Sequence, residues 1–339
     1  TVGFHPTKRG SIPLGTAMNF MKKKIAIIEE IHQDGLVLLE KNPGYNFELI
    51  TDVSDENLIR RLPEFDACTL RVTKLNEKIL KHCPKLKVIS RHGVGIDNVD
   101  LNYIKKNNIS LLITATANAV AVAEHVMTMF LALSKSVKEY DTEVRKGNFE
   151  KNAASIETSE LLNKNILIAG FGRIGKKLIN RCLAFETKVY VYDPYVSGDV
   201  IKSFGGVKID SINEALQIAD FVTLHMPFTP ETKNLINYSI LKKMKKNSII
   251  VNTARGGIIN ENDLEKALNE NLISGAALDV FLKEPVEENN PLLANNRVIL
   301  SPHSATFTKE CTSRMGIETT KNIIDYFENK IDKSMIVKL

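Results

Sequence analysis

The sequence predicts an α/β fold made of two doubly wound, parallel-sheet domains. Its length of 339 residues suggests two domains of ordinary size. Short apolar runs alternate with helical patterns along most of the chain, which is typical of parallel strands joined by helices. A glycine-rich turn follows the apolar run Ile166–Ala169 and leads into an amphipathic helix, as in dinucleotide-binding domains.

The first part of the chain predicts a complete α/β domain in front of that turn. Strands are expected at Ile25–Ile28, Phe47–Ile50, Ala67–Leu70, Val88–Ser90 and Leu111–Ile113. Helices are expected at about Gly35–Lys41, Asp55–Leu62, Asn76–His82 and Asn102–Asn107. Residues 1–20 fit neither pattern and lack the apolar region of a signal peptide. We expect a disordered leader there, which is either an added extension or a targeting arm.

The loop Arg91–Asp100 follows the fourth expected strand and contains Gly93 and Gly95. Glycines in such a loop expose backbone N–H groups, which suit an anion such as a substrate carboxylate. An ordinary glycine turn closed by a capping aspartate is the alternative.

A long apolar helix is expected from Ala119 to about Lys146, as the passage into the second domain. Glu124 and His125 lie near its start. Both could be functional, but their position near the start of a helix and ordinary packing explain them as well.

Gly170, Gly172 and Gly175 have the G-x-G-x-x-G spacing of a dinucleotide-binding turn. The first glycine permits the tight turn, the second lets the backbone approach a pyrophosphate, and the third lets the helix from Arg173 to Phe185 pack on the strand. The pyrophosphate would meet the N–H groups at the start of that helix. Asp193 ends the next apolar run, where a carboxylate binds ribose hydroxyls and repels a 2′-phosphate. NAD is therefore expected rather than NADP.

The alternation of strands and helices resumes after Asp193. Strands are expected at Phe221–Leu224, Ser248–Asn252, Gly275–Val280 and Val298–Leu300, and a tail strand at Met335–Lys338. Helices are expected at Ile212–Ile218, from Tyr238, at Glu261–Asn269 and from Thr308 to about Asn329. The loop His225–Pro227 follows the first of these strands and lies where a bound dinucleotide would pass.

Composition argues against several other classes of protein. The net charge of +5 comes from 45 basic and 40 acidic residues spread along the chain, without the aromatic-interleaved basic stripe of a nucleic-acid-binding protein. No apolar run is long enough to span a bilayer. The four cysteines have neither C-x-x-C nor zinc-site spacing, so we expect reduced thiols in a cytoplasmic protein and no metal site.

Arg255, Glu284 and His303 follow three expected strands of the second domain. Parallel sheets bind ligands beyond the carboxyl ends of their strands. A guanidinium can bind a carboxylate and polarise the adjacent carbonyl, and a histidine beside a carboxylate can exchange a proton with the carbonyl oxygen. With a dinucleotide as the hydride carrier, this set predicts interconversion of 2-keto and 2-hydroxy acids. Taken singly, each residue is more often a surface or loop residue.

From Lys22 to Leu339 the sequence resembles the D-isomer-specific 2-hydroxyacid dehydrogenase family. The resemblance rests on ordered motifs at Arg91–Asp97, Gly170–Gly175, Val251–Gly257, Ala277–Phe281 with Glu284-Pro285, and Ser301–His303. It implies a flavodoxin-like substrate domain (residues 21–118 and 309–339) and a Rossmann NAD domain (residues 119–308). It also implies a cleft between the domains that closes over substrate, and a homodimer formed through the NAD domain.

The same resemblance implies roles for single residues. His303 would be the acid/base, Glu284 would tune it, and Arg255 would bind the substrate carboxylate and carbonyl. Val94 and Gly95 would offer backbone N–H groups to that carboxylate. The candidate cofactor-binding residues are Gly170, Gly172, Arg173, Ile174, Gly175, Asp193, His225, Pro227, Thr232, Thr253, Ala254 and Asp279, the last near the nicotinamide.

Within the family, the sequence is most similar to the phosphoglycerate dehydrogenase branch and its hydroxypyruvate and glyoxylate reductase neighbours. Arg71 and Lys74 lie in a loop similar to the one where phosphoglycerate enzymes place a phosphate-contacting arginine, with ordinary surface charge as the alternative. Two features depart from that branch. The chain ends at Leu339, so no C-terminal serine-sensing domain is expected, and Ser304–Thr306 differs from the run usual after the histidine.

The substrate expected first is 3-phosphoglycerate or phosphohydroxypyruvate, in serine biosynthesis, with hydroxypyruvate, glyoxylate or another 2-keto acid as the alternative. A rival of another class is a non-catalytic NAD(H)-sensing protein similar to a corepressor of this fold. It should carry a peptide-binding groove or a basic partner surface, and the sequence shows no sign of either. Another Rossmann enzyme, such as a methyltransferase, fits the glycines but leaves Arg255, Glu284 and His303 unexplained.

Overall fold

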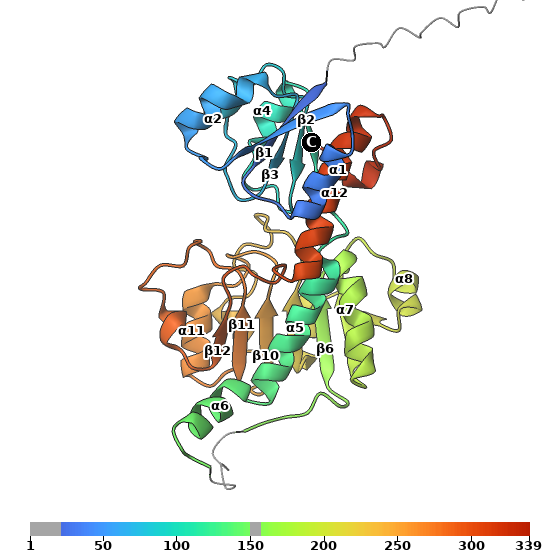
Figure 1. Ribbon diagram of the computed structural model, residues 1–339. Coiled ribbons are helices and arrows are strands. Elements are labelled where there is room, and N and C mark those ends of the chain that lie inside the picture. The colour runs from blue at the N-terminus through green and yellow to red at the C-terminus, as the bar shows by residue number, and fades with distance from the viewer. Residues whose placement is uncertain (1–21, 150–156) are drawn as a thin grey trace, which may run out of the picture.

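The computed structural model describes residues 22–149 and 157–339, so the expected leader lies outside the described residues. The chain forms two α/β domains, the first above the second in Figure 1, and each domain has its own parallel sheet. The predicted fold class, two doubly wound parallel-sheet domains, is confirmed.

The first domain contains a five-stranded parallel sheet in the order β2-β1-β3-β4-β5, which is the flavodoxin-like order. Its strands are β1 (Lys23–Ile28), β2 (Tyr45–Ile50), β3 (Ala67–Leu70), β4 (Val88–Arg91) and β5 (Ser110–Leu112). Its helices are α1 (Gln33–Glu40), α2 (Asp55–Arg61), the 3-10 turn η1 (Leu62–Glu64), α3 (Glu77–Leu80) and α4 (Leu101–Lys106). The strand order reverses between β1 and β3, so a ligand crevice is expected beyond their carboxyl ends.

The second domain contains a seven-stranded parallel sheet in the order β12-β11-β10-β9-β6-β7-β8, a Rossmann order extended by one strand. Its strands are β6 (Asn165–Ala169), β7 (Lys188–Tyr192), β8 (Val207–Lys208), β9 (Phe221–Leu224), β10 (Ile249–Asn252), β11 (Gly275–Leu278) and β12 (Val298–Leu300). Its helices are α7 (Arg173–Ala184), α8 (Gly198–Ser203), α9 (Ile212–Ile218), α10 (Tyr238–Leu241), α11 (Glu261–Asn269) and the 3-10 turn η2 (Pro291–Ala294). Here the order reverses between β6 and β9.

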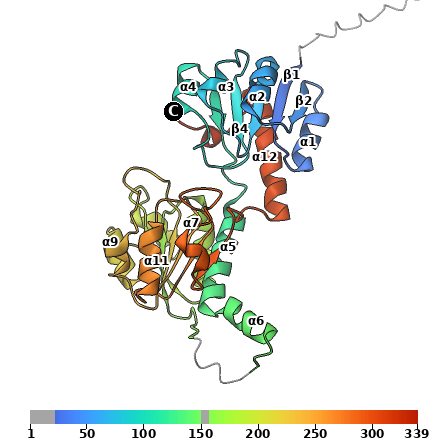
Figure 2. The same cartoon turned by 90° about the vertical axis from the view of Figure 1, so that its left-hand side faces the viewer.

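Two helices connect the domains, α5 (Ala119–Ser134) and α12 (Lys309–Phe327). Both views show them meeting between the sheets (Figures 1 and 2). α5 packs on α7 and β10 of the second domain, and α12 packs on α1 and β4 of the first. Where the two helices meet, a small apolar cluster is formed by Ala117, Ala121, Cys311 and Met315.

Burial explains why the strands read as apolar runs. Every residue of β3, β9, β10 and β11 is buried, since helices cover both faces of each sheet. Fully burying a valine, leucine or isoleucine side chain contributes about 1.5–3 kcal/mol. Both sheets therefore have an apolar core on each face.

Two predicted elements are wrong. The long helix expected from Ala119 to Lys146 is divided into α5 and α6 (Val137–Arg145), which are bent by 58°. Ser136, between them, adopts a left-handed backbone conformation (φ 48°) that no α-helix can contain. The expected tail strand, Met335–Lys338, is a 3-10 turn, η3 (Lys333–Met335), followed by a single bridge at Ile336.

No single helix in the described part of the chain is long and apolar enough to cross a membrane. Taken together, the bent pair of α5 and α6 has the length and the apolar composition that a membrane-spanning segment needs. However, nine of the 16 residues of α5 are buried within the protein, as expected for a core helix.

Candidate active site

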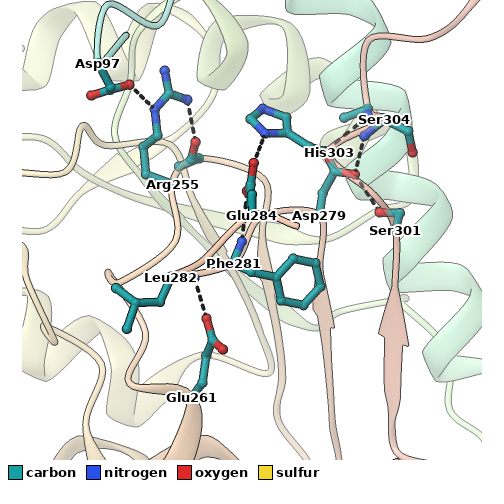
Figure 3. A network of polar contacts seen from close by, with 12 residues as sticks. Asp97, Arg255, Glu261, Asp279, Phe281, Leu282, Glu284, Ser301, His303 and Ser304 are labelled. Atoms are coloured by element: carbon teal, nitrogen blue, oxygen red, sulfur yellow. Dashed lines mark hydrogen bonds and ion pairs between the residues drawn. The ribbon is translucent and has the colours of Figure 1, made fainter. Parts of the chain in front are cut away.

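The carboxyl ends of three adjacent strands bring Arg255, Glu284 and His303 into one site. Arg255 lies in the turn after β10, Glu284 in the loop after β11, and His303 in the loop after β12. Figure 3 shows the three side chains on the same side of these strand ends. The second domain thus gathers the three residues to which the sequence assigns the chemistry.

His303 and Glu284 form a hydrogen-bonded pair. His303 Nδ1 lies 2.8 Å from Glu284 Oε2, while Glu284 Oε1 accepts the backbone N–H of Phe281 over 3.0 Å. The bond to Glu284 raises the pKa of His303 above its ordinary value, and this effect outweighs the opposing effect of burial. Burial raises the pKa of Glu284, but the bonds from His303 and Phe281 more than offset it, so the net shift is downward. The pair therefore favours imidazolium beside carboxylate.

Arg255 reaches from the second domain to the first. Its Nε donates to Asp97 Oδ2 over 3.0 Å, and its Nη1 donates to the carbonyl of Ala254 over 2.6 Å (Figure 3). Its Nη2 lies against Gly95, where an added Cβ would come within 2.2 Å of that nitrogen. Val94, next to Gly95, is 38% exposed. The guanidinium thus faces the glycine loop that the sequence predicts to bind a carboxylate.

Two charged residues of this loop, Arg91 and Asp97, border the site although the sequence predicts no role for either side chain. Arg91 donates to the carbonyls of Gly95 and Leu70 over 2.6 and 2.8 Å, and also to that of Arg71. Burial and the nearby charge of Arg255 lower the pKa of Arg91 to about 10, so it stays charged at neutral pH. Arg91 ties together the two loops that border the first-domain side of the site. The sequence signal that could have indicated a role for Arg91 is its position directly after an expected strand.

Asp279 is only 2% exposed, and its carboxylate binds the loop that carries His303. Oδ1 accepts the Ser301 hydroxyl over 2.6 Å and the N–H of Ser304 over 2.8 Å, and Oδ2 accepts the N–H of Ala305 over 3.1 Å. Figure 3 shows Asp279 between its own strand end and this loop. The predicted position near a nicotinamide remains a prediction, whereas the contacts with the loop are direct.

The glycine turn after β6 has the shape that a dinucleotide requires. Gly170 has φ 104°, and a Cβ there would lie 2.6 Å from the carbonyl oxygen of His225, at the point where the strand order reverses. A Cβ on Gly172 would meet nothing within 4 Å, so open space remains where a pyrophosphate would approach. Asp193 accepts N–H groups of Phe171 and Tyr195 over 2.7 and 2.8 Å, which fixes its carboxylate beside the turn. These residues fit NAD.

The other predicted cofactor residues lie after the neighbouring strands β9 and β10 or at the start of α7. Arg173 and Ile174 begin α7, with Gly175 buried against the turn. Further sites follow β9 and β10, namely His225, Pro227, Thr232, Thr253 and Ala254. Burial lowers the pKa of His225 to about 4, so it is neutral. His225 Nδ1 and the Thr253 hydroxyl are buried without a partner among the described residues, which leaves polar atoms for a ligand.

Arg71 and Lys74 follow β3, at the reversal point of the first sheet. Arg71 Nη1 donates to the carbonyl of Glu30 over 3.0 Å. Lys74 is exposed. The loop itself is held by Glu29, whose carboxylate accepts the N–H groups of Val72 and Thr73.

Residues 127–305 match the family model described as "D-isomer specific 2-hydroxyacid dehydrogenase, NAD binding domain". The chain is 34% identical over 314 residues to a D-3-phosphoglycerate dehydrogenase of Methanocaldococcus jannaschii, covering 92% of this chain and 59% of that protein. It is 33% identical to a glyoxylate reductase of Thermococcus litoralis over 94% of this chain and 98% of that protein. The chain thus spans little more than half the length of the phosphoglycerate dehydrogenase, but nearly all of the reductase.

Among solved structures, the D-lactate dehydrogenase of Aquifex aeolicus, complexed with NAD and lactic acid, is similar with a TM-score of 0.81. The sequences are 28% identical, over 92% of this chain and 98% of that one. The fold, the glycine-rich turn, the site at the strand ends and the family model all indicate the same family. The chain belongs to the D-isomer specific 2-hydroxyacid dehydrogenase family.

Proposed function

We propose that the protein is an NAD-dependent D-2-hydroxyacid dehydrogenase that interconverts a 2-keto acid and the corresponding 2-hydroxy acid. The observation that carries this proposal is the pair of His303 and Glu284, 2.8 Å apart, beside Arg255 at the carboxyl edge of the NAD-binding sheet. A proton donor and a carboxylate-binding cation are what keto-acid reduction needs from the protein.

The residues divide the reaction between them. Arg255 holds the substrate carboxylate with help from the N–H groups of Val94 and Gly95, and it polarises the keto oxygen. When NADH is bound at the glycine turn, its nicotinamide would supply the hydride for the carbonyl carbon. The His303 imidazolium gives its proton to the carbonyl oxygen, and Glu284 stabilises the imidazolium until that transfer. The reverse reaction begins with neutral His303 as the base.

For the substrate, we propose 3-phosphoglycerate and phosphohydroxypyruvate first. Arg71 follows β3, where the strand order of the first sheet reverses, and the partly buried Arg91 adds a second positive charge near Arg255. Two cations beyond the carboxylate site favour a substrate with a second anionic group. Glyoxylate or hydroxypyruvate is the second candidate, because relatives of nearly equal identity carry both names.

The assay is NADH oxidation at neutral pH with phosphohydroxypyruvate, hydroxypyruvate, glyoxylate, pyruvate and branched 2-keto acids. Preference for the phosphorylated acid, lost in Arg71→Ala, would support phosphoglycerate oxidation. Arg60→Ala, at an arginine of the nearby helix α2 that bonds Asn57, serves as the control for loss of surface charge. If the wild type and Arg71→Ala both prefer an unphosphorylated acid, the proposed mechanism stands and Arg71 is excluded from the substrate site. No turnover with any of these acids, together with tight NADH binding, would favour the alternative of a non-catalytic NAD(H)-sensing protein.

His303→Ala tests the mechanism itself. We expect turnover to fall by about 10²–10⁴-fold, the usual contribution of a general acid, while NADH still binds. His82→Ala, at an exposed histidine of the first domain, is the matched control. Undiminished turnover in His303→Ala would show that another group protonates the substrate.

A further inference from the structure

His125 lies on α5 and has no role in the chemistry above, yet its side chain reaches the loop that carries His303. His125 Nε2 lies 3.1 Å from Ser301 Oγ, and that hydroxyl donates to Asp279 Oδ1 over 2.6 Å. A serine hydroxyl has one hydrogen. Because Ser301 gives this hydrogen to Asp279, His125 must donate its Nε2–H to the hydroxyl oxygen.

The same contacts compensate a buried charge. The Asp279 carboxylate accepts one hydroxyl and two backbone N–H groups, all from residues 301–305. Among the basic side chains of the described ranges 22–149 and 157–339, His125 is the one that lies within 4 Å of the Asp279 carboxylate. Its Nε2 is 3.8 Å from Asp279 Oδ1. A buried carboxylate is tolerated only with such donors. The network therefore holds the chain on both sides of His303.

The His303 loop needs this support. His303 has φ 53°, a left-handed conformation that is unfavourable for a residue with a Cβ and persists only where its surroundings impose it. Its side chain is 51% exposed, so packing alone does not hold it. α5 provides a firm base, because Ala123 and Val126 on either side of His125 are fully buried in the second domain.

We propose that His125 is a positioning residue: through Ser301 and Asp279 it braces the His303 loop against α5, so that the imidazole meets the substrate carbonyl in a fixed geometry. The kinetic consequence rests on the proposed function. The bracing itself is a property of the folded chain and can be measured without substrate.

The test compares variants that remove or keep the donor. His125→Leu has no donor, and Ser301→Ala removes the group that receives it. In both we expect faster amide hydrogen exchange in residues 301–305 and a fall in kcat of about 10–100-fold, since a displacement of roughly 1 Å can cost 10²-fold. The affinity for NADH should be unchanged. His125→Gln, whose amide can donate, should recover most of the lost kcat.

Glu124→Gln is the matched control, because Glu124 precedes His125 on α5 and pairs with Arg181 of α7 instead. Exchange and kcat should match the wild type there. Wild-type exchange and kcat in His125→Leu would overturn the proposal, as would wild-type values in Ser301→Ala if His125→Leu does not fold. If the wild type reduces no keto acid but His125→Leu still exchanges faster at residues 301–305, the brace holds and the proposed reaction fails.

Discussion

At the scale of single residues, the bond between His303 and Glu284 sets the pH dependence. It raises the pKa of His303, so the imidazolium persists above the ordinary histidine value of about 6.5. Reduction uses the imidazolium as its acid. The kcat/KM for reduction should therefore be level at low pH and fall as pH rises through the raised pKa, while oxidation should rise over the same range.

Glu284→Gln should shift this profile. Loss of the carboxylate charge lowers the pKa of His303, so the falling limb of reduction and the rising limb of oxidation both move to lower pH. The measurement is kcat/KM against pH in both directions. Glu287→Gln, at an exposed carboxylate of the same loop that pairs with Lys283, should keep the wild-type profile. A Glu284→Gln profile that superimposes on the wild type would remove Glu284 as the tuning group.

Asp193 should decide between the two cofactors. Asp193→Asn removes the charge facing a 2′-phosphate and keeps one oxygen, which can accept the N–H of either Phe171 or Tyr195. Like charges about 4 Å apart repel by roughly 1–4 kcal/mol, so we expect the preference for NADH over NADPH to fall about tenfold or more. Steady-state kinetics with both cofactors measures this ratio. Asp199→Asn, exposed on α8, should leave it unchanged, and an unchanged ratio in Asp193→Asn would exclude Asp193 from the ribose site.

The candidate site was predictable from sequence only in part. Arg255, Glu284 and His303 follow the ends of parallel strands, where ligands bind. Residue type and local pattern were therefore enough to predict them. The pairing of Arg255 with Asp97 and of His125 with Ser301 joins residues 158 and 176 positions apart. Such contacts depend on how two domains and a connecting helix pack, and no local pattern encodes that packing.

At the scale of elements, α12 follows the whole second domain in sequence yet completes the first domain. Ser90 of β4 donates to the carbonyl of Thr319, and Asn322 donates to the carbonyl of Ile113. Ile323 is fully buried in the core between α12 and the first sheet. The stability of the first domain therefore depends on a helix far from it in sequence.

Ile323→Ala should destabilise the first domain by about 2–5 kcal/mol, the usual cost of such a cavity. Calorimetry should show a lower Tm for the first domain, with the NADH-dependent stabilisation of the second domain retained. Lys321→Ala, two residues away and exposed, is the control. Equal loss in both domains would mean that they unfold as one unit.

The accuracy of the predicted elements followed their length and burial. Apolar runs buried on both faces, such as β3 and β9, were predicted within a residue or two. The strand β8 was missed because its two residues are too few to show a period, and α8 was missed because Ser197, Gly198 and Asp199 at its start are typical of a turn. The break at Ser136 was missed because the sequence on both sides of it favours a helix, and only a backbone angle marks the end of α5.

At the scale of the whole molecule, α6 is an α-helix with an exposed apolar face in the described part of the chain. None of its residues is buried, and Val137 and Val144 are 52% and 53% exposed. Tyr140 lies one turn of helix from each of them and is 36% exposed. Figures 1 and 2 show α6 at the end of the second domain far from the first domain. Exposed apolar residues at this spacing on a helix are typical of a surface that packs against another chain.

We therefore propose that a second copy of the chain covers α6, which is consistent with a homodimer formed through the NAD domain. Light scattering after gel filtration should give twice the chain mass of 37.9 kDa for the wild type. Val137→Asp combined with Val144→Asp should give the monomer mass, because the added charges oppose burial. Val207→Asp, which replaces a valine of similar exposure (56%) on β8, should remain dimeric. A monomeric wild type, or a dimer that survives both aspartates, would exclude α6 as the interface.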